Sequence, residues 1–223
     1  MDKRRIKDLL YEQVARIGKA LASPKRLELL EVLAQGEKTV EALSAELSID
    51  FKLASSHLKA LRASRLVESR RDGKYVLYRL SGPDVSDLWV NLREVAEEHL
   101  LELRMAIDQM VAQPDKLSKV DRKALLDQAK RGEVIVIDVR PQGEYETAHL
   151  PFARSMPLEE LEKRLSELPR RREIVAYCRG PFCMLSDEAI KLLHARGYKA
   201  RKILDGVIEW QAAGLPVTSG KPA

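Results

Sequence analysis

The sequence contains little cysteine and no long apolar run. Its 223 residues include two cysteines, Cys178 and Cys183, which are too few for a disulfide framework or a four-ligand zinc site. A membrane-spanning helix would need about 18 consecutive apolar residues, and no such run occurs. The charged amino terminus also lacks the apolar segment of a secretory signal. We therefore expect a cytoplasmic protein with no membrane partner.

Charge is distributed unevenly along the chain. Aromatic residues make up only 5% of the sequence, but a hydrophobic share of 45% is enough for ordinary packed cores. Residues 50–79 carry eight basic and three acidic side chains, whereas residues 84–108 carry two basic and seven acidic ones. The positive charge is thus gathered on one short unit. Together with the formal net charge of +5, this points to nucleic acid as a partner.

The periodicity of the apolar residues changes once along the chain. Residues 1–113 predict helices and one hairpin, including a long helix over 84–112. Residues 117–218 alternate helices with continuous apolar runs at 134–137 and 174–177, which are typical of buried parallel strands. The helices expected there cover 122–130, 158–168 and 185–196. The predicted fold class is therefore multidomain, a mainly α domain followed by an α/β domain with a parallel sheet.

The basic unit has the element order of a winged helix-turn-helix. Two helices are expected at 40–47 and 51–63, and alternating runs then flank Asp72-Gly73, a strong hairpin signal. In such a unit the second helix enters the major groove of DNA and the hairpin lies beside the backbone. The residues expected to anchor the second helix inward are Leu53, Leu58 and Leu61.

Candidate DNA-binding residues are hydrogen-bond donors on the second helix and cations around the hairpin. They can reach base edges and neutralise phosphates. The alternative is a solvated helical face beside a charged hairpin tip. The candidates are Lys52, Ser55, Ser56, His57, Lys59, Arg62, Arg70, Arg71 and Lys74.

Three segments of the first half occur in a specific combination: Ser23-Pro24-Lys25-Arg26-Leu27, Ser55-Ser56-His57-Leu58-Lys59-Ala60-Leu61 and Arg71-Asp72-Gly73-Lys74-Tyr75. With them, roughly the first 112 residues closely resemble the ArsR/SmtB family of dimeric bacterial repressors. The resemblance implies a homodimer built by the first helix and the helix over 84–112, binding a double-stranded DNA operator. One departure is Arg65, where the family often has glycine.

Many members of that family sense metals, but this chain shows no convincing metal site. No cysteine precedes Cys178, and the charged residues Asp87, Glu98, His99 and Glu102 are typical of a solvated helix face. We therefore expect no metal and no cofactor, and the first half contains no evident receptor for a signal.

A six-residue loop from Cys178 to Cys183 joins a predicted buried strand to a helix. Backbone amides at such a junction cradle an anion, and the helix amino terminus favours negative charge. We expect Cys178 to be ionised there, assisted by Arg179, and therefore nucleophilic near neutral pH. The alternative is a small core residue that closes the strand. The residues expected to bind sulfur or an anion are Arg179, Gly180, Phe182, Cys183 and Met184.

Further segments surround this loop in the sequence: Ile137-Asp138-Val139-Arg140-Pro141, Glu144-Tyr145, Ala148-His149-Leu150-Pro151, Asp205-Gly206 and the end from Trp210 to Val217. They resemble the rhodanese (sulfurtransferase) domain over about residues 117–218. The resemblance implies that Cys178 attacks a sulfane-sulfur donor, carries the sulfur as a persulfide and passes it to a thiol acceptor. We interpret Asp138, Arg140 and Glu144 as a supporting buried network and His149 as locally bonded.

The loop departs from the usual rhodanese pattern at two points. Gly180 is third and Pro181 fourth, whereas many rhodanese loops place glycine fourth, and proline removes one amide donor from the cradle. Cys183 is an addition that could resolve the persulfide into a disulfide or polysulfide bridge. Alternatively, Cys183 only supplies a backbone amide.

The two halves together predict a transcriptional repressor whose sulfurtransferase domain loads sulfur on Cys178 and alters operator affinity. The main alternative is an active thiosulfate or persulfide sulfurtransferase that the DNA-binding half only localises or regulates. A third hypothesis is an inactive loop on a domain that docks a partner protein.

Overall fold

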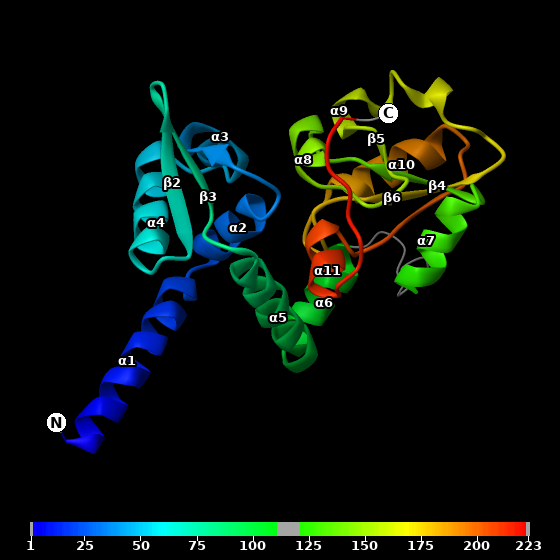
Figure 1. The fold of residues 1–223 in the computed structure, drawn as a ribbon. Helices are drawn as coiled ribbons and strands as arrows, with labels where there is room; N and C mark the ends of the chain where they lie inside the picture. Colours follow the sequence, from blue (N-terminus) through cyan, green and yellow to red (C-terminus); the bar gives the residue numbers. More distant parts are fainter. Residues whose placement is uncertain (1, 111–120, 222–223) are drawn as a thin grey trace. The chain divides into compact units, whose positions relative to one another are not determined.

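The chain consists of two compact units, residues 1–89 and 90–223 (Figure 1). The structure is a computed structural model that describes residues 2–110 and 121–221. The division between the units falls inside one helix, α5 (Pro83–His99). The domain boundary predicted at 113–117 lies outside the described residues.

The first unit contains the predicted winged helix-turn-helix. Thr39 begins the third helix by accepting a hydrogen bond from the Ala42 amide, and Asp50 begins the fourth by accepting one from the Leu53 amide. The described strands of this unit form an antiparallel sheet in the order β1-β3-β2. The elements are α1 (Lys3–Leu21), α2 (Pro24–Leu33), β1 (Lys38–Thr39), α3 (Val40–Glu46), α4 (Phe51–Ala63), β2 (Val67–Asp72) and β3 (Tyr75–Leu80).

Helix α4 buries a slightly different face from the one predicted. Leu58 and Leu61 are fully buried, but Leu53 is 40% exposed and Ala54 occupies the inward position instead. The reason is the helical period, because positions 54, 58 and 61 follow one another at intervals of four and three and share one stripe. The inward role predicted for Leu53 was therefore wrong.

Arg65 adopts a left-handed backbone conformation between α4 and β2. Its φ is +58°, and its amide donates a hydrogen bond to the Arg62 carbonyl. Glycine enters this region of φ at little cost, whereas other residues are strained there. This conformation explains why a glycine would suit the position.

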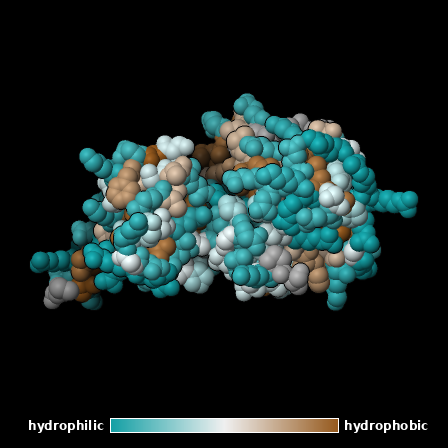
Figure 2. Space-filling view, turned by 90° about the horizontal axis from the view of Figure 1, so that it is seen from above, coloured by the Kyte–Doolittle hydropathy of each residue, from teal (hydrophilic) through white to brown (hydrophobic). Residues whose placement is uncertain are grey.

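Helix α1 presents apolar side chains to solvent in the single chain. Of its 19 residues only Ala20 is buried, while Leu9, Leu10 and Val14 are 49%, 62% and 72% exposed. The rest of the visible surface is different, since hydrophilic side chains predominate on the face shown in Figure 2.

The predicted long helix over 84–112 is interrupted. Helix α5 ends at His99, and α6 (Leu101–Met110) begins after Leu100. Arg104 donates a hydrogen bond (3.0 Å) to the Glu98 carbonyl, one of the carbonyls that the end of α5 leaves without a helical partner. Within the described residues, no helix combines the length and apolarity that a bilayer crossing requires.

The second unit contains a four-stranded parallel sheet in the order β5-β4-β6-β7, as the continuous apolar runs predicted. Its elements are α7 (Arg122–Lys130), β4 (Val134–Asp138), α8 (Gln142–Thr147), β5 (Arg154–Ser155), α9 (Leu158–Leu161), a 3-10 turn (Leu165–Glu167), β6 (Glu173–Tyr177), α10 (Leu185–Ala195), β7 (Ala200–Lys202) and α11 (Val207–Ala212). The helix predicted over 158–168 is thus one helical turn and a 3-10 turn. Pro169 disfavours a helical Leu168, which is extended.

Helices cover both faces of this sheet. On one face Ile137, Ala176 and Cys178 pack with α9 and α10, and on the other Val136, Tyr177 and their neighbours pack with α7, α8 and α11. Both faces are therefore dry, as expected for a parallel sheet. Cys178 lies at the carboxyl end of β6, the edge at which open α/β sheets bind ligands.

Candidate functional site

The predicted DNA-binding side chains are gathered on α4 and on the β2–β3 hairpin. On α4, Lys52, Ser56, Lys59 and Arg62 are exposed, while Ser55 and His57 are half-buried. Arg70, Arg71 and Lys74 are exposed on the hairpin. Partial burial, followed by the nearby Arg26 cation, lowers the pKa of His57 below its ordinary value. His57 is therefore mainly neutral at pH 7 and acts as a hydrogen-bonding group rather than a phosphate counter-charge.

Arg70 differs from its neighbours because it already has a carboxylate partner. Its guanidinium nitrogens lie 2.6 to 3.0 Å from the two carboxylate oxygens of Glu37, and a third contact of 3.5 Å reaches Asp72. The bidentate geometry fixes the guanidinium against its own chain. Arg70 is thus less suited to a phosphate contact than Arg71 or Lys74.

Cys178 is enclosed by its own loop. Its side chain is 1% exposed, and its Sγ lies 3.4 Å from the Cys183 carbonyl oxygen, 3.5 Å from the Ser186 hydroxyl and 4.0 Å from the Gly180 carbonyl oxygen. Cys183 is half-buried, and both cysteines are free thiols. The loop curls so that the Cys183 amide donates a hydrogen bond to the Gly180 carbonyl (3.1 Å).

The ionisation predicted for Cys178 is reversed in the structure. Burial raises the pKa of the Cys178 thiol well above its ordinary value, and the thiol hydrogen-bonds to Cys183. That hydrogen bond, with the amides of Arg179 and Leu185, lowers the pKa of Cys183 to about 6. The negative charge therefore lies on the more exposed sulfur, because a buried thiolate would lose its hydration.

Arg179 does not point into the loop as predicted. Its guanidinium donates two hydrogen bonds to the Glu144 carboxylate, 2.9 and 2.6 Å long. This pair ties the loop to α8. The contribution of Arg179 to the loop's anion cradle is therefore its backbone amide and a more distant positive charge that favours the Cys183 thiolate.

A second buried network supports the end of β4. The guanidinium of Arg140 donates to both oxygens of the Asp138 carboxylate, and it also bonds the Ala148 carbonyl at 2.7 Å. The Tyr177 hydroxyl donates to Asp138 at 2.6 Å and accepts from the Leu150 amide. His149 is bonded locally, through Nδ1 to the Tyr145 carbonyl, and its ring stacks on that of Tyr145. These side chains brace the strand beside the loop.

Two glycines shape the loop. Gly180 is buried with φ of +153°, and Gly206 lies so close that a Cβ there would sit 2.5 Å from the Arg179 carbonyl oxygen and 2.6 Å from that of Cys178. Phe182 is half-buried, whereas Met184 is 52% exposed. The loop is therefore seated directly on the turn that precedes α11.

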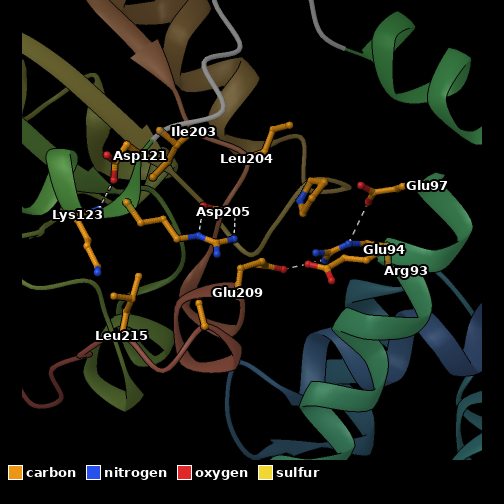
Figure 3. Close-up of a pocket in the computed structure, with 13 residues that line it drawn as sticks. Arg93, Glu94, Glu97, Asp121, Lys123, Ile203, Leu204, Asp205, Glu209 and Leu215 are labelled. Atoms are coloured by element: carbon orange, nitrogen blue, oxygen red, sulfur yellow. Dashed lines mark hydrogen bonds and ion pairs between the residues drawn. The ribbon is translucent and has the colours of Figure 1, made fainter.

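Three residues near the loop were missed by the sequence analysis. Ser186 contacts the Cys178 sulfur from the first turn of α10, and the serine eight residues after the cysteine was the available signal. Arg93 and Glu209 form a buried ion pair, and no local pattern connects residues so far apart in sequence. Both line a pocket of about 640 Å³ that also contacts Pro181 (Figure 3).

No metal cluster is formed by the described residues, since no three His, Cys, Asp or Glu side chains among them are grouped to hold an ion. Asp87, Glu98, His99 and Glu102 belong to this described part of the chain.

Comparison with known families identifies both halves. Residues 23–69 match the family described as "Bacterial regulatory protein, arsR family", and residues 121–213 match the "Rhodanese-like domain".

Similar individual proteins cover either the whole chain or one half. The HTH-type transcriptional regulator Rv0324 of Mycobacterium tuberculosis is 42% identical over 216 residues, which are 97% of this chain and 95% of that protein. A sulfurtransferase of Allochromatium vinosum is 29% identical over 46% of this chain and 96% of its own. The solved homodimeric winged helix-turn-helix domain of Mb0332 from Mycobacterium bovis is 44% identical, covers 46% of this chain and 93% of its own, and superposes with a TM-score of 0.42.

Proposed function

The chain belongs to the HTH-type transcriptional regulators of the ArsR family that carry a rhodanese-like domain, and from this we propose that it is a sulfur-responsive repressor. In this proposal a homodimer binds a double-stranded DNA operator in the cytoplasm, and sulfur carried on Cys178 changes its affinity for that operator. The observation that carries the proposal is the position of Cys178, at the strand-to-helix loop of a second unit on the same chain as the DNA-binding unit.

Operator binding would use the exposed donors of α4 and the hairpin cations. Lys59 and Arg62 on the helix and Arg71 and Lys74 on the hairpin supply positive charge that can neutralise phosphates. The exposed apolar side chains of α1, including Leu10 and Val14, support a dimer, because monomeric proteins rarely leave such a stripe in water.

Sulfur loading can be written as a balanced step. The Cys183 thiolate accepts the proton of the Cys178 thiol while the Cys178 sulfur attacks the outer sulfur of thiosulfate. The S–S bond of thiosulfate breaks, sulfite leaves with the bonding electron pair, and Cys178 becomes a persulfide anion. In the second step an acceptor thiolate takes the outer sulfur, and Cys178 leaves as a thiolate.

Cys183 gives the persulfide a second fate. Its thiolate can attack the inner sulfur of a protonated Cys178 persulfide, which forms a Cys178–Cys183 disulfide and expels hydrosulfide. Three loop residues place the two sulfurs in one hydrogen-bonded pair: Cys178, Gly180 and Cys183. The disulfide and the persulfide differ by one sulfur atom, so mass spectrometry separates them.

The test compares operator affinity before and after sulfur treatment. An operator is selected from random-sequence duplex DNA with the untreated protein, and its Kd is measured with and without sodium tetrasulfide. We expect a change in Kd of at least fivefold for the wild type and none for Cys178→Ser. Equal responses of the two proteins would contradict the proposal.

A working sulfurtransferase is the second candidate function. The similarity of this half to the Allochromatium vinosum sulfurtransferase, which it covers almost completely, favours it. In that case steady turnover of thiosulfate with cyanide would depend on Cys178, and operator affinity would not respond to sulfur.

A further inference from the structure

Helix α5 places a buried cation against the persulfide-forming loop. Arg93 is 3% exposed, and its Nη1 lies 2.7 Å from the Glu209 Oε1 of α11, which is 2% exposed. Its Nε lies 3.1 Å from Glu97 one turn further along α5. In Figure 3 the guanidinium of Arg93 lies between these two carboxylates. A charge pair so far removed from water depends strongly on its geometry.

Glu209 is fixed at the turn beneath the loop. Its Oε2 accepts a hydrogen bond of 2.7 Å from the Gly206 amide, and Gly206 in turn packs against the carbonyl oxygens of Cys178 and Arg179. The carboxylate thus has one oxygen on the loop's support and the other on Arg93.

The loop itself closes onto the ion pair. A Cβ placed on Gly180 would lie 3.1 Å from Glu209 Oε1 and 3.4 Å from Arg93 Nη1. The Phe182 ring lies on the same guanidinium, with its centroid 5.9 Å from Arg93 Cζ. Both residues are within four positions of Cys178, so movement of the loop displaces groups that contact Arg93.

Sulfur loading requires such movement. The Cys178 Sγ is enclosed by the Gly180 and Cys183 carbonyls and the Ser186 hydroxyl at 3.4 to 4.0 Å. A second sulfur bonded at about 2 Å from Sγ occupies space that these loop atoms now fill. The loop must therefore open, and Gly180 and Phe182 shift against Arg93.

From these contacts we propose that Arg93 is the positioning residue through which the sulfur state of Cys178 acts on the DNA-binding unit. The inference rests on the proposed function and adds a route to it. Helix α5 is continuous from Val85, which packs in the core of the first unit, to Arg93, about 12 Å further along the helix axis. A displaced Arg93 therefore acts on a helix that is itself part of the DNA-binding unit.

The test uses the full-length protein and the selected operator. Arg93→Met removes the cation but keeps an unbranched side chain, and Glu209→Gln removes the opposite charge at nearly constant shape. The control is Glu94→Gln, which changes an exposed residue next to Arg93 on α5. For each protein, operator Kd is measured with and without tetrasulfide, and the sulfur on Cys178 is measured as added mass.

We expect Arg93→Met and Glu209→Gln to load sulfur on Cys178 while their operator Kd changes less than twofold, with Glu94→Gln responding like the wild type. Arg93→Lys, which keeps the charge, should restore part of the response. A full response in Arg93→Met or Glu209→Gln would overturn the inference, and so would failure of both variants to load sulfur, because the pair would then serve only the loop's structure. Absence of a response in the wild type would instead contradict the proposed function itself.

Discussion

The guanidinium of Arg179 and the carboxylate of Glu144 face each other across two hydrogen bonds of 2.9 and 2.6 Å. Arg179 directly follows the reactive cysteine, and Glu144 belongs to α8 on the far side of β4 in the sequence. The pair therefore joins the sulfur loop to a neighbouring helix and commits the arginine's charge to that task.

Removing the Glu144 charge should destabilise the second unit. Glu144→Gln leaves one weaker hydrogen bond to Arg179 in a partly buried site, and we expect the free energy of unfolding to fall by about 1–3 kcal/mol. Urea denaturation followed by circular dichroism measures this change. Glu159→Gln, at an exposed glutamate of α9, is the control and should leave the free energy within about 0.5 kcal/mol of wild type.

The hairpin arginines should contribute unequally to DNA binding. Arg71→Ala should weaken operator binding and reduce the slope of log K against log salt by about one, as expected for one lost phosphate contact. Arg70→Ala should have a smaller effect because its guanidinium is held by Glu37. Glu37→Gln should release Arg70 and tighten binding. Fluorescence anisotropy across a salt series distinguishes these outcomes, and equal slopes for the two arginine variants would contradict the assignment.

The two thiols should react with an alkylating reagent at different rates and with a characteristic pH dependence. Because the pKa of Cys183 is lowered to about 6, its thiolate is present above that pH and is lost as the pH falls through it. Iodoacetamide at pH 7 should therefore modify Cys183 before the buried Cys178, with a rate that drops below about pH 6. Peptide mapping by mass spectrometry assigns the site. Faster modification of Cys178 would show that it is the ionised sulfur.

The buried face of α4 should be evident from a matched pair of leucine variants. Leu58 is fully buried, so Leu58→Ala should lower the free energy of unfolding by about 2–5 kcal/mol. Leu53 is 40% exposed, so Leu53→Ala should cost less than about 1 kcal/mol. Thermal unfolding of both variants measures the difference, and similar losses would contradict the inward position of Ala54.

Local patterns were sufficient for most of the fold. Capping residues such as Thr39 and Asp50, the Asp72-Gly73 turn and the continuous apolar strand at 134–137 depend on neighbours in the sequence, and each lies in the predicted kind of element. Apolar spacing was misleading where another local effect was stronger. The residue before Pro169 could not remain helical, so the predicted helix over 158–168 was shortened.

The electrostatics of the site could not be predicted in the same way. A strand-to-helix loop suggests an ionised cysteine, but which sulfur carries the charge depends on burial, and only the fold places Cys178 deeper than Cys183. The side-chain directions of Arg179 and Arg70 depend on Glu144 and Glu37, which are distant in sequence. Arg93 is 116 residues from Glu209, so the sequence carried no signal for that pair.

The position of Arg93 on α5 also determines how the gene can be divided. A fragment that starts at Asp121, where the rhodanese match begins, would retain the Glu209 carboxylate without its cation. Burial already raises the pKa of that carboxylate, and without Arg93 it would rise further. Any recombination that exchanges the regulatory half of this protein between relatives would therefore have to transfer the end of α5 with it.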